Sequence, residues 1–258
     1  MQDIKIIFFD IDGTLISLDK DDISAKTRKA LSALKEKGII LVIASGRSPI
    51  QIPHFDGIDF DCHLTFNGSL CFNDKDQIFS NPLDRADVLK LIENAKAMDK
   101  PLGLASRDRY VANYLNDDLG KYFSFGSTMP DIVDDIGKFV RDNDVYQMVM
   151  PIKKEEYEKA LAGTDKLKIT AWWDRAVDII PHDGGKGRSV EKILEYYGFD
   201  KNEALAFGDG DNDIEMFEQV RGIAMENASE NLKNISFDTC KSVDSDGVYY
   251  YLKDKGII

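Results

Sequence analysis

The chain has 258 residues, of which 43% are hydrophobic and 31% are charged, and this balance excludes a disordered or collagen-like protein. Its 46 acidic and 33 basic side chains give a formal net charge of −13, which disfavours nucleic-acid binding because a phosphate backbone would be repelled. The 3 cysteines are widely spaced and form no C-x-x-C pair, so neither a disulfide framework nor a zinc site is indicated.

The beginning of the chain enters an apolar run at once, without the basic stretch and small-residue cleavage site of a signal peptide. The sequence also lacks an apolar run long enough to span a bilayer. Together with the cysteine pattern, these features favour a cytoplasmic protein that binds neither membranes nor nucleic acid.

The first elements predicted along the chain are two buried strands with a helix between them. Residues 4–10 form an apolar run that ends in an aspartate, a pattern typical of a strand buried on both faces. Ser24 is placed to cap a helix that Gly38 ends, and residues 39–44 form the second strand. A helix that connects two such strands is typical of a parallel sheet.

The middle of the chain has a different texture. We predict a helix over residues 88–98, a strand over 145–150 and a helix near 154–161. A charge-rich stretch covers residues 131–144, and residues 169–180 are expected to form a hairpin. This mixture is typical of an α+β domain.

Strand and helix alternate again near the end of the chain. A helix is predicted from about 189 to 197, a strand over 204–207, a helix over 213–219 and a short strand over 223–225. The return of this alternation indicates that the last segment completes the parallel sheet begun by the first.

The predicted fold class is therefore α/β, with a Rossmann-like parallel-sheet core and an inserted α+β domain. We expect residues 1–81 and 181–258 to form the core and residues 82–180 to form the insert. Both parts then have ordinary domain sizes.

The first strand runs into Asp10-Ile-Asp12-Gly13-Thr14, at the edge where open parallel sheets bind ligands. Residues two apart in a strand point the same way, so both carboxylates can address one substrate. A divalent cation would relieve their repulsion, because it takes hard oxygen ligands. A solvated turn is the structural alternative, but the position at a strand end favours a site.

Two further motifs supply groups that can bind anions. Ser45-Gly46-Arg47 ends the second strand, where a hydroxyl and backbone N–H groups can receive an anion, although Ser-Gly after a strand is also a common turn. Lys186 lies among glycines and can reach a phosphate oxygen as a point charge; the alternative is a surface lysine in a flexible loop.

The fourth motif follows the strand predicted at 204–207. Residues 208–213 read GDGDND, which places three carboxylates and an amide within five residues. Carboxylates at this density would repel one another unless a cation lay among them, so the motif favours metal binding.

Rival motifs fail at particular positions. In an EF-hand loop beginning at Asp209, Ile214 would occupy the glycine position and Val220 the final glutamate position. A dinucleotide fingerprint would require glycine at Asp213, and a Walker A loop would require serine or threonine at Gly187. A zinc site is disfavoured because the histidines lack ligand spacing: His54, His63 and His182.

In this order, the motifs D-x-D-G-T, S-G-R, K-G and G-D-x-x-N-D resemble those of the haloacid dehalogenase superfamily of aspartate-nucleophile phosphatases. The large insert between the second and third motifs, with Asn67 and Gly68 shortly before it, is similar to the α/β-capped Cof-type subgroup. That subgroup includes sugar-phosphate phosphatases. The resemblance covers nearly the whole chain, and it is tightest in the four motifs.

The resemblance implies roles for the first two motifs. Asp10 would be the nucleophile that attacks phosphorus and becomes an aspartyl phosphate. Asp12 would protonate the leaving alkoxide and then deprotonate the hydrolytic water. Thr14 would orient the carboxylate of Asp10. For Arg47, a phosphate ligand and a structural ion pair at the start of a helix both remain open.

The resemblance also implies a magnesium site and a phosphate site. Asp10, the backbone carbonyl of Asp12 and Asp209 would hold Mg²⁺, with Asp213 supporting these ligands from behind. Four groups would surround the phosphoryl oxygens and stabilise their charge: Ser45, the Gly46 amide, Lys186 and Asn212.

The implied activity is Mg²⁺-dependent hydrolysis of a small phosphorylated metabolite, such as a sugar phosphate, by a monomer or weak homodimer. A phosphotransferase such as a phosphohexomutase would use the same motifs, but would release no phosphate without an acceptor. A receiver-type signalling module also carries an acidic pair, a phosphorylated aspartate and a lysine. Receivers are shorter, however, and lack an inserted domain.

The inserted domain, or cap, is expected to select the substrate. We predict that the hairpin carrying Trp172, Trp173, Asp174 and Arg175 lines the substrate cavity. Adjacent residues in a strand point to opposite faces, so one tryptophan would lie in the core while the other stacks on a sugar face.

Overall fold

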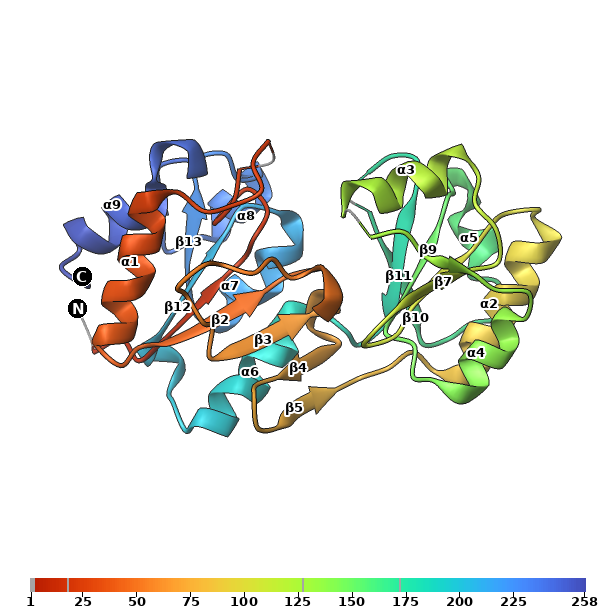
Figure 1. Ribbon diagram of the computed structural model, residues 1–258, viewed down its shortest axis with the longest axis horizontal. Coiled ribbons are helices and arrows are strands. Elements are labelled where there is room, and N and C mark those ends of the chain that lie inside the picture. The colour runs from red at the N-terminus through yellow and green to blue at the C-terminus, as the bar shows by residue number, and fades with distance from the viewer. Residues whose placement is uncertain (1–2, 18, 127, 172) are drawn as a thin grey trace. The chain divides into compact units, whose positions relative to one another are not determined.

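The computed structural model describes residues 3–17, 19–126, 128–171 and 173–258. These residues form two compact units (Figure 1). The first unit comprises residues 1–46, 53–80 and 185–258, and the second comprises residues 47–52 and 81–184. The predicted insert, residues 82–180, falls inside the second unit, which also takes in the short segment 47–52.

Among the described residues, the first unit contains one eight-stranded sheet. Its strands are β1 (Ile6–Phe9), β2 (Ile40–Ala44), β3 (Cys62–Thr65), β4 (Leu70–Phe72), β5 (Gln77–Ser80), β12 (Ala204–Gly208), β13 (Arg221–Met225) and β14 (Asp238–Cys240). They lie in the order β14-β13-β12-β1-β2-β3-β4-β5. The strands from β14 to β3 run parallel, while β4 and β5 are added antiparallel at one edge. The predicted parallel sheet is therefore confirmed.

Helices cover both faces of this sheet (Figure 1). They are α1 (Ala25–Glu36), α6 (Lys186–Tyr197), α7 (Ile214–Gln219), α8 (Glu230–Ile235) and α9 (Gly247–Asp254). Phe8 of β1 is fully buried in one apolar cluster with residues of α6, α7 and α8. On the other face, Phe9 stacks on Phe207 at 5.4 Å between ring centres, and Phe207 meets Tyr251 of α9 edge-on. Because both faces are covered, the central strands are apolar throughout.

The predicted helix boundaries near the start of the chain are confirmed. Ser24 caps α1 by accepting a hydrogen bond of 3.0 Å from the backbone N–H of Thr27. Gly38 ends the helix with a φ of +73°, a left-handed conformation that glycine adopts without steric cost.

In the second unit, the described residues form a six-stranded sheet of mainly antiparallel strands. The strands are β6 (Gly103–Ala105), β7 (Tyr110–Ala112), β8 (Asp131–Ile132), β9 (Gln147–Met150), β10 (Leu167–Thr170) and β11 (Val177–Pro181), in the order β10-β11-β9-β6-β7-β8. The helices are α2 (Arg85–Ala97), α3 (Asp117–Phe125), α4 (Ile136–Asp142) and α5 (Tyr157–Ala160). Apolar residues of α2, α4 and α5 share one buried cluster with the sheet.

The predicted hairpin is confirmed, since Ile169 of β10 lies opposite Ile179 of β11 in an antiparallel pair. The prediction that the two tryptophans lie on a strand is wrong for Trp173, which falls in the connection between Thr170 and Val177. Trp172 lies outside the described residues. No helix in the described parts of either unit is long and apolar enough to cross a membrane.

His63 on β3 is a half-buried polar residue of the first unit. Its ring stacks on Phe72 at 5.2 Å, and its Nδ1 atom is buried without a hydrogen-bond partner among the described residues. Burial disfavours the charged imidazolium and lowers the pKa of His63 below its usual value. The folded chain therefore takes up a proton here less readily than the unfolded chain.

We expect His63 to cost stability in acid. Between about pH 7 and pH 5 the unfolded chain protonates His63, whereas the folded chain keeps it neutral. The free energy of unfolding therefore decreases as the pH is lowered through this range. Urea unfolding of the wild type and of His63→Phe, which keeps the stacked ring, measures this contribution. The wild type should lose stability relative to the variant as the pH falls; a constant difference would contradict the prediction.

Candidate active site

The carboxyl ends of three neighbouring strands carry the predicted site residues. Asp10 directly follows β1, Asp209 follows β12 and Ser45 follows β2. The backbone N–H of Asp10 donates to the carbonyl of Phe207 at 3.0 Å, so the residue stays attached to the sheet. The motifs meet because β12, β1 and β2 are adjacent parallel strands.

A buried lysine joins two of these motifs. The Lys186 Nζ atom lies 2.7 Å from Asp10 Oδ1 and 2.6 Å from Asp213 Oδ1. The side chains of Lys186 and Asp213 have no exposed surface, and Asp10 is buried. Asp10, Asp209 and Asp213 offer carboxylate oxygens that lie within 4.8 Å of one another.

The alternative that Lys186 lies in a flexible surface loop is wrong. Lys186 is the first residue of α6, which begins three residues earlier than the start predicted at Ser189. Gly185 occupies the capping position, so the first turn of the helix holds the lysine stem in place. Two carboxylates then satisfy the buried ammonium group, which a solvated lysine would not need.

Burial and charge shift the pKa values in this cluster. Burial raises the pKa of Asp10 well above its usual range; Lys186 opposes that rise, and Asp213 and Asp209 add to it. Burial and the neighbouring Asp213 raise the pKa of Asp209 to about 7. For Lys186, burial works against the charge, but Asp10 and Asp213 outweigh it and raise the pKa. The cluster therefore favours a cationic partner.

Asp213 and Thr14 both act on the Asp209 segment. Asp213 Oδ2 accepts hydrogen bonds from the backbone N–H groups of Asp209 at 3.0 Å and Gly210 at 3.2 Å. Thr14 donates to Asp209 Oδ1 at 3.1 Å, so the expectation that it orients Asp10 is corrected. Gly13 turns the chain at a φ of +82°, and a Cβ atom there would overlap the Asp209 carboxylate. This turn directs Thr14 toward the end of β12.

Asn227 belongs to the site and was missed by the sequence analysis. Its Nδ2 atom donates to the Gly13 carbonyl at 3.0 Å and to Asp209 Oδ2 at 3.2 Å. The residue lies outside the four motifs, just after β13. Its place beyond the carboxyl end of another parallel strand is the one signal that could have identified it.

Two of the aspartates in the predicted motifs, Asp211 and Asp12, do not belong to the cluster of three carboxylates. Asp211 is exposed and accepts hydrogen bonds from Ser229, which caps α8, and from Asn231 in that helix. Asp12 is half-buried and lies beyond the end of β1, where it forms an isolated bridge to Ile16. Asp12 therefore does not share a strand face with Asp10.

Three of the four predicted phosphate-binding residues meet at Asn67. Ser45 is 1% exposed, and its carbonyl accepts a hydrogen bond of 3.1 Å from the backbone N–H of Asn67. Asn212 Nδ2 donates to Asn67 Oδ1 at 3.1 Å. A Cβ atom on Gly46 would lie 3.0 Å from that same oxygen. In the sequence, Asn67 stands out only as a feature of the subgroup that the chain resembles.

Arg47 belongs to the second unit, where Nη1 donates to the carbonyl of Gln51 at 3.0 Å. This bond closes the short 3₁₀ turn over Pro49–Gln51.

The predicted cap residues lie against α3. The Trp173 ring meets Phe125 edge-on at 5.3 Å, and the Arg175 guanidinium lies 5.2 Å from the centre of the Trp173 ring. Arg175 also forms an ion pair with Asp118, while Asp174 is exposed. These contacts fasten the β10–β11 connection to the helix.

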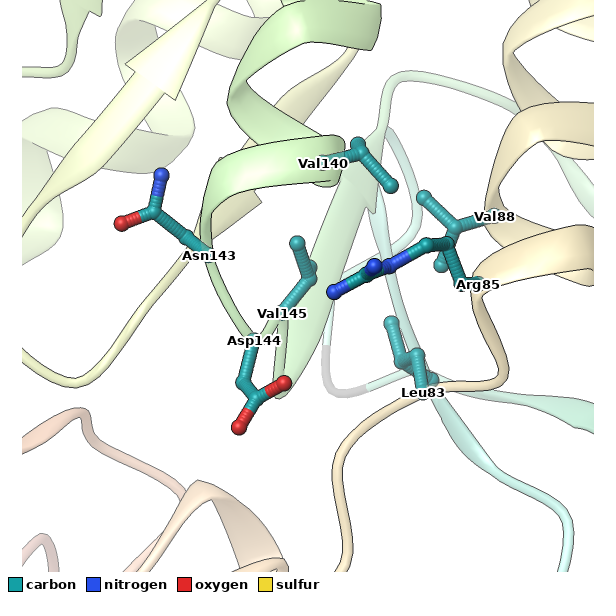
Figure 2. Close-up of a pocket in the computed structure, with 7 residues that line it drawn as sticks. All are labelled: Leu83, Arg85, Val88, Val140, Asn143, Asp144 and Val145. Atoms are coloured by element: carbon teal, nitrogen blue, oxygen red, sulfur yellow. The ribbon is translucent and has the colours of Figure 1, made fainter.

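A pocket of about 330 Å³ opens elsewhere in the second unit (Figure 2). Its apolar lining comes from buried side chains, and Arg85 extends from α2 across the space between Val88 and Val145. The lining residues are Leu83, Arg85, Val88, Val140, Asn143, Asp144 and Val145. The predicted site residues do not line this pocket.

Comparisons with known proteins identify relatives over nearly the full length. A family model described as haloacid dehalogenase-like hydrolase matches residues 7–252. YkrA of Bacillus subtilis (strain 168), provisionally named a phosphatase, is 33% identical over 258 residues, covering 99% of each chain. The structure of BT1666 from Bacteroides thetaiotaomicron, analysed among phosphatases of the HAD superfamily, matches with a TM-score of 0.89 and 27% identity, covering 99% of this chain and 96% of that one. The HAD subclass IIB sugar phosphatase BT4131 matches with a TM-score of 0.85 and 27% identity, covering 98% and 100%.

Proposed function

Since the chain belongs to the haloacid dehalogenase-like hydrolase family and is a phosphatase of that family, we propose that it hydrolyses small phosphate monoesters through an aspartyl phosphate on Asp10, with Mg²⁺ as cofactor. Sugar phosphates are the proposed substrate class. The core, residues 1–81 and 181–258, would carry the chemistry, and the cap, residues 82–180, would select the ester.

The observation that carries this proposal is the bridge from Asp10 through Lys186 to Asp213. A carboxylate that attacks phosphorus must be held in one orientation, and it must approach an anionic group without being repelled. The Lys186 ammonium group does both, since it fixes one Asp10 oxygen and places a positive charge beside it. The ammonium group has three N–H donors, of which Asp10 and Asp213 use two. The third can bind a phosphoryl oxygen.

The acidic cluster fits a magnesium ion. Its carboxylate oxygens are the hard ligands that Mg²⁺ prefers. In the described ion pairs of this cluster, Lys186 is the cationic partner of both Asp10 and Asp213. A divalent cation would balance the remaining negative charge. We assign Asp10, Asp209 and the backbone carbonyl of Asp12 as ligands. When bound, the ion would supply charge stabilisation for the transferring phosphoryl group.

The chain's own groups would then divide the reaction into two steps. Asp10 forms a bond to phosphorus as the bond to the ester oxygen breaks, and Asp12 protonates that leaving oxygen. Asp12 next removes a proton from water, which attacks phosphorus and releases Asp10 and inorganic phosphate. The half-buried position of Asp12 supports this role, because both the leaving group and water must reach it. Ser45, the Gly46 amide and Asn212 would hold the phosphoryl oxygens.

A screen of phosphate esters with and without Mg²⁺ tests the proposed function. Release of inorganic phosphate from sugar phosphates in water, without an added acceptor, is the expected result. Transfer to a second sugar with no net release of phosphate would instead indicate a phosphotransferase. A stable phosphoprotein without turnover would contradict hydrolysis altogether.

Chelation is expected to silence the enzyme, because three clustered carboxylates, two of them buried and that of Asp209 half-buried, would then face an anionic substrate without a metal ion. Added Mg²⁺ should restore activity and raise Tm, since a ligand that binds the folded state alone stabilises it by mass action. Activity assays and thermal melting in EDTA, with and without excess Mg²⁺, measure both effects. Full activity in excess chelator, or rescue by Zn²⁺ and never by Mg²⁺, would rule out the oxygen-ligated site.

Asp174→Ala tests the proposed role of the cap connection in choosing the substrate. If the exposed carboxylate contacts a sugar, the substitution should change relative kcat/KM values among sugar phosphates about tenfold. Hydrolysis of p-nitrophenyl phosphate should remain nearly unchanged, because this small ester lacks the sugar hydroxyls. Equal losses on every ester would assign the residue to folding or closure of the cap.

A further inference from the structure

A turn with an unusual backbone connects β3 to β4. Phe66, Asn67 and Gly68 have φ values of +52°, +51° and +97°, and all three residues are buried. Non-glycine residues rarely adopt this left-handed conformation, least of all a bulky phenylalanine. Such conformations persist only where the surrounding structure imposes them, and they concentrate at functional sites.

The centre of the turn holds two of the proposed phosphate-binding segments. The backbone N–H of Asn67 donates to the carbonyl of Ser45 at 3.1 Å, and its side-chain amide packs on Gly46. The same side chain accepts a hydrogen bond of 3.1 Å from Asn212 Nδ2. One residue thus joins the end of β2 to the segment that follows β12.

The end of the turn holds the third segment. The hydroxyl group of Ser189 in α6 donates a hydrogen bond to the Gly68 carbonyl. A Cβ atom on Gly68 would overlap the carbonyl oxygen of Gly185, the residue that precedes Lys186, so only glycine permits this approach. The first turn of α6, and with it the base of the Lys186 side chain, is fixed against the strained turn.

We propose that the turn formed by residues 66–68 is a clamp that sets the spacing of the phosphate-binding groups, and that Asn67 is a positioning residue that acts through Asn212. The inference rests on the proposed function. The three segments come from distant parts of the sequence, and the described structure joins each of them to this turn.

The amide of Asn67 has a specific task in the clamp. An asparagine Nδ2 group carries two N–H donors, and Asn67 Oδ1 accepts from that of Asn212. That bond fixes the plane of the Asn212 amide, which leaves the second N–H with a set direction for a phosphoryl oxygen. Asparagine also tolerates the left-handed backbone better than most residues, so one residue type meets both demands.

Asn67→Gly separates the amide from the backbone, because glycine adopts a positive φ without strain and lacks the side chain. We expect kcat for p-nitrophenyl phosphate to fall about tenfold or more, with a smaller change in KM. The Kd of inorganic phosphate should rise about tenfold, because a misdirected Asn212 loses its hydrogen bond to the charged phosphate. The melting temperature should not fall. Asp99→Gly is the matched control, since Asp99 has a φ of +53° but is exposed after α2; it should leave kcat and phosphate affinity unchanged.

A double-mutant cycle tests whether Asn67 acts through Asn212. Asn67→Gly combined with Asn212→Ala should lose little more activity than Asn212→Ala alone. Losses that multiply in the double variant, or an Asn67→Gly protein whose kcat and phosphate affinity stay within about twofold of the wild type, would overturn the clamp.

Phosphate binding, measured by calorimetry with inorganic phosphate in the presence of Mg²⁺, separates this inference from the proposed function. A wild type that binds phosphate but hydrolyses no ester would refute the phosphatase mechanism, and the phosphate affinity of Asn67→Gly would still decide the clamp. A wild type that neither binds phosphate nor hydrolyses an ester would overturn both.

Discussion

Asp10→Asn is expected to abolish phosphate release from every ester that the wild-type protein hydrolyses. The amide is a poor nucleophile toward phosphorus and carries no charge to offer a metal ion. The substitution should leave the fold intact, because Lys186 keeps its 2.6 Å contact with Asp213. In addition, burial already disfavours the charged form of the Asp10 carboxyl group, so a neutral amide of the same size is tolerated there. Steady-state release of phosphate and thermal melting of the purified variant measure the two effects.

Asp12→Asn is the matched control for that result. It removes the proposed acid–base group and should lower kcat by about 10² to 10⁴, while Mg²⁺ still raises Tm because a backbone carbonyl supplies the ligand at this position. More than trace Mg²⁺-dependent activity in Asp10→Asn would remove Asp10 as the nucleophile. Unchanged activity in Asp12→Asn would remove Asp12 from the mechanism.

Lys186→Met should both inactivate and destabilise the protein. The variant leaves Asp10 and Asp213 buried without their cationic partner, and breaking a buried pair in this way costs about 3–5 kcal/mol. Urea unfolding in EDTA measures the loss in the free energy of unfolding. Lys192→Met is the control on the same helix: Lys192 is half-exposed and pairs with the exposed Glu195, so its replacement should change stability by at most about 0.5 kcal/mol.

The pH dependence distinguishes lost charge pairing from lost packing. Without Lys186, the buried Asp10 holds a proton more tightly in the folded chain than in the unfolded chain, so the variant gains stability relative to the wild type as the pH falls. The deficit of Lys186→Met should therefore be smaller at about pH 5 than at about pH 8. A deficit that stays constant would assign the effect to packing, and a variant as stable as the wild type would contradict the buried bridge.

The parallel core could be predicted from local patterns. Apolar runs such as residues 4–10 specify strands covered on both faces, and Ser24 and Gly38 specify the ends of the helix between two of them. Once those strands are adjacent and parallel, Asp10 and Asp209 must meet at their carboxyl ends. The location of the site therefore follows from periodicity and position.

The partners within the site could not be predicted in the same way. Whether Thr14 donates to Asp10 or to Asp209 depends on the left-handed turn at Gly13 and on the close approach of β12, which no local pattern encodes. For the same reason, local sequence cannot distinguish a phosphate-binding Lys186 from a surface lysine, since its burial depends on two carboxylates distant in sequence. Asn227 carries no motif at all, and only the completed sheet places it beside Asp209.

The most direct test of the central claim is to trap the phosphoryl group on Asp10. Asp12→Asn with p-nitrophenyl phosphate suits this purpose, because the activated leaving group needs no acid while hydrolysis of the intermediate lacks its base. Rapid acid quench followed by peptide mass spectrometry should find one phosphoryl group on the peptide that contains Asp10, formed with a burst of p-nitrophenol equal to the enzyme. A variant that hydrolyses the ester with neither burst nor label, or a label on another residue, would contradict the account.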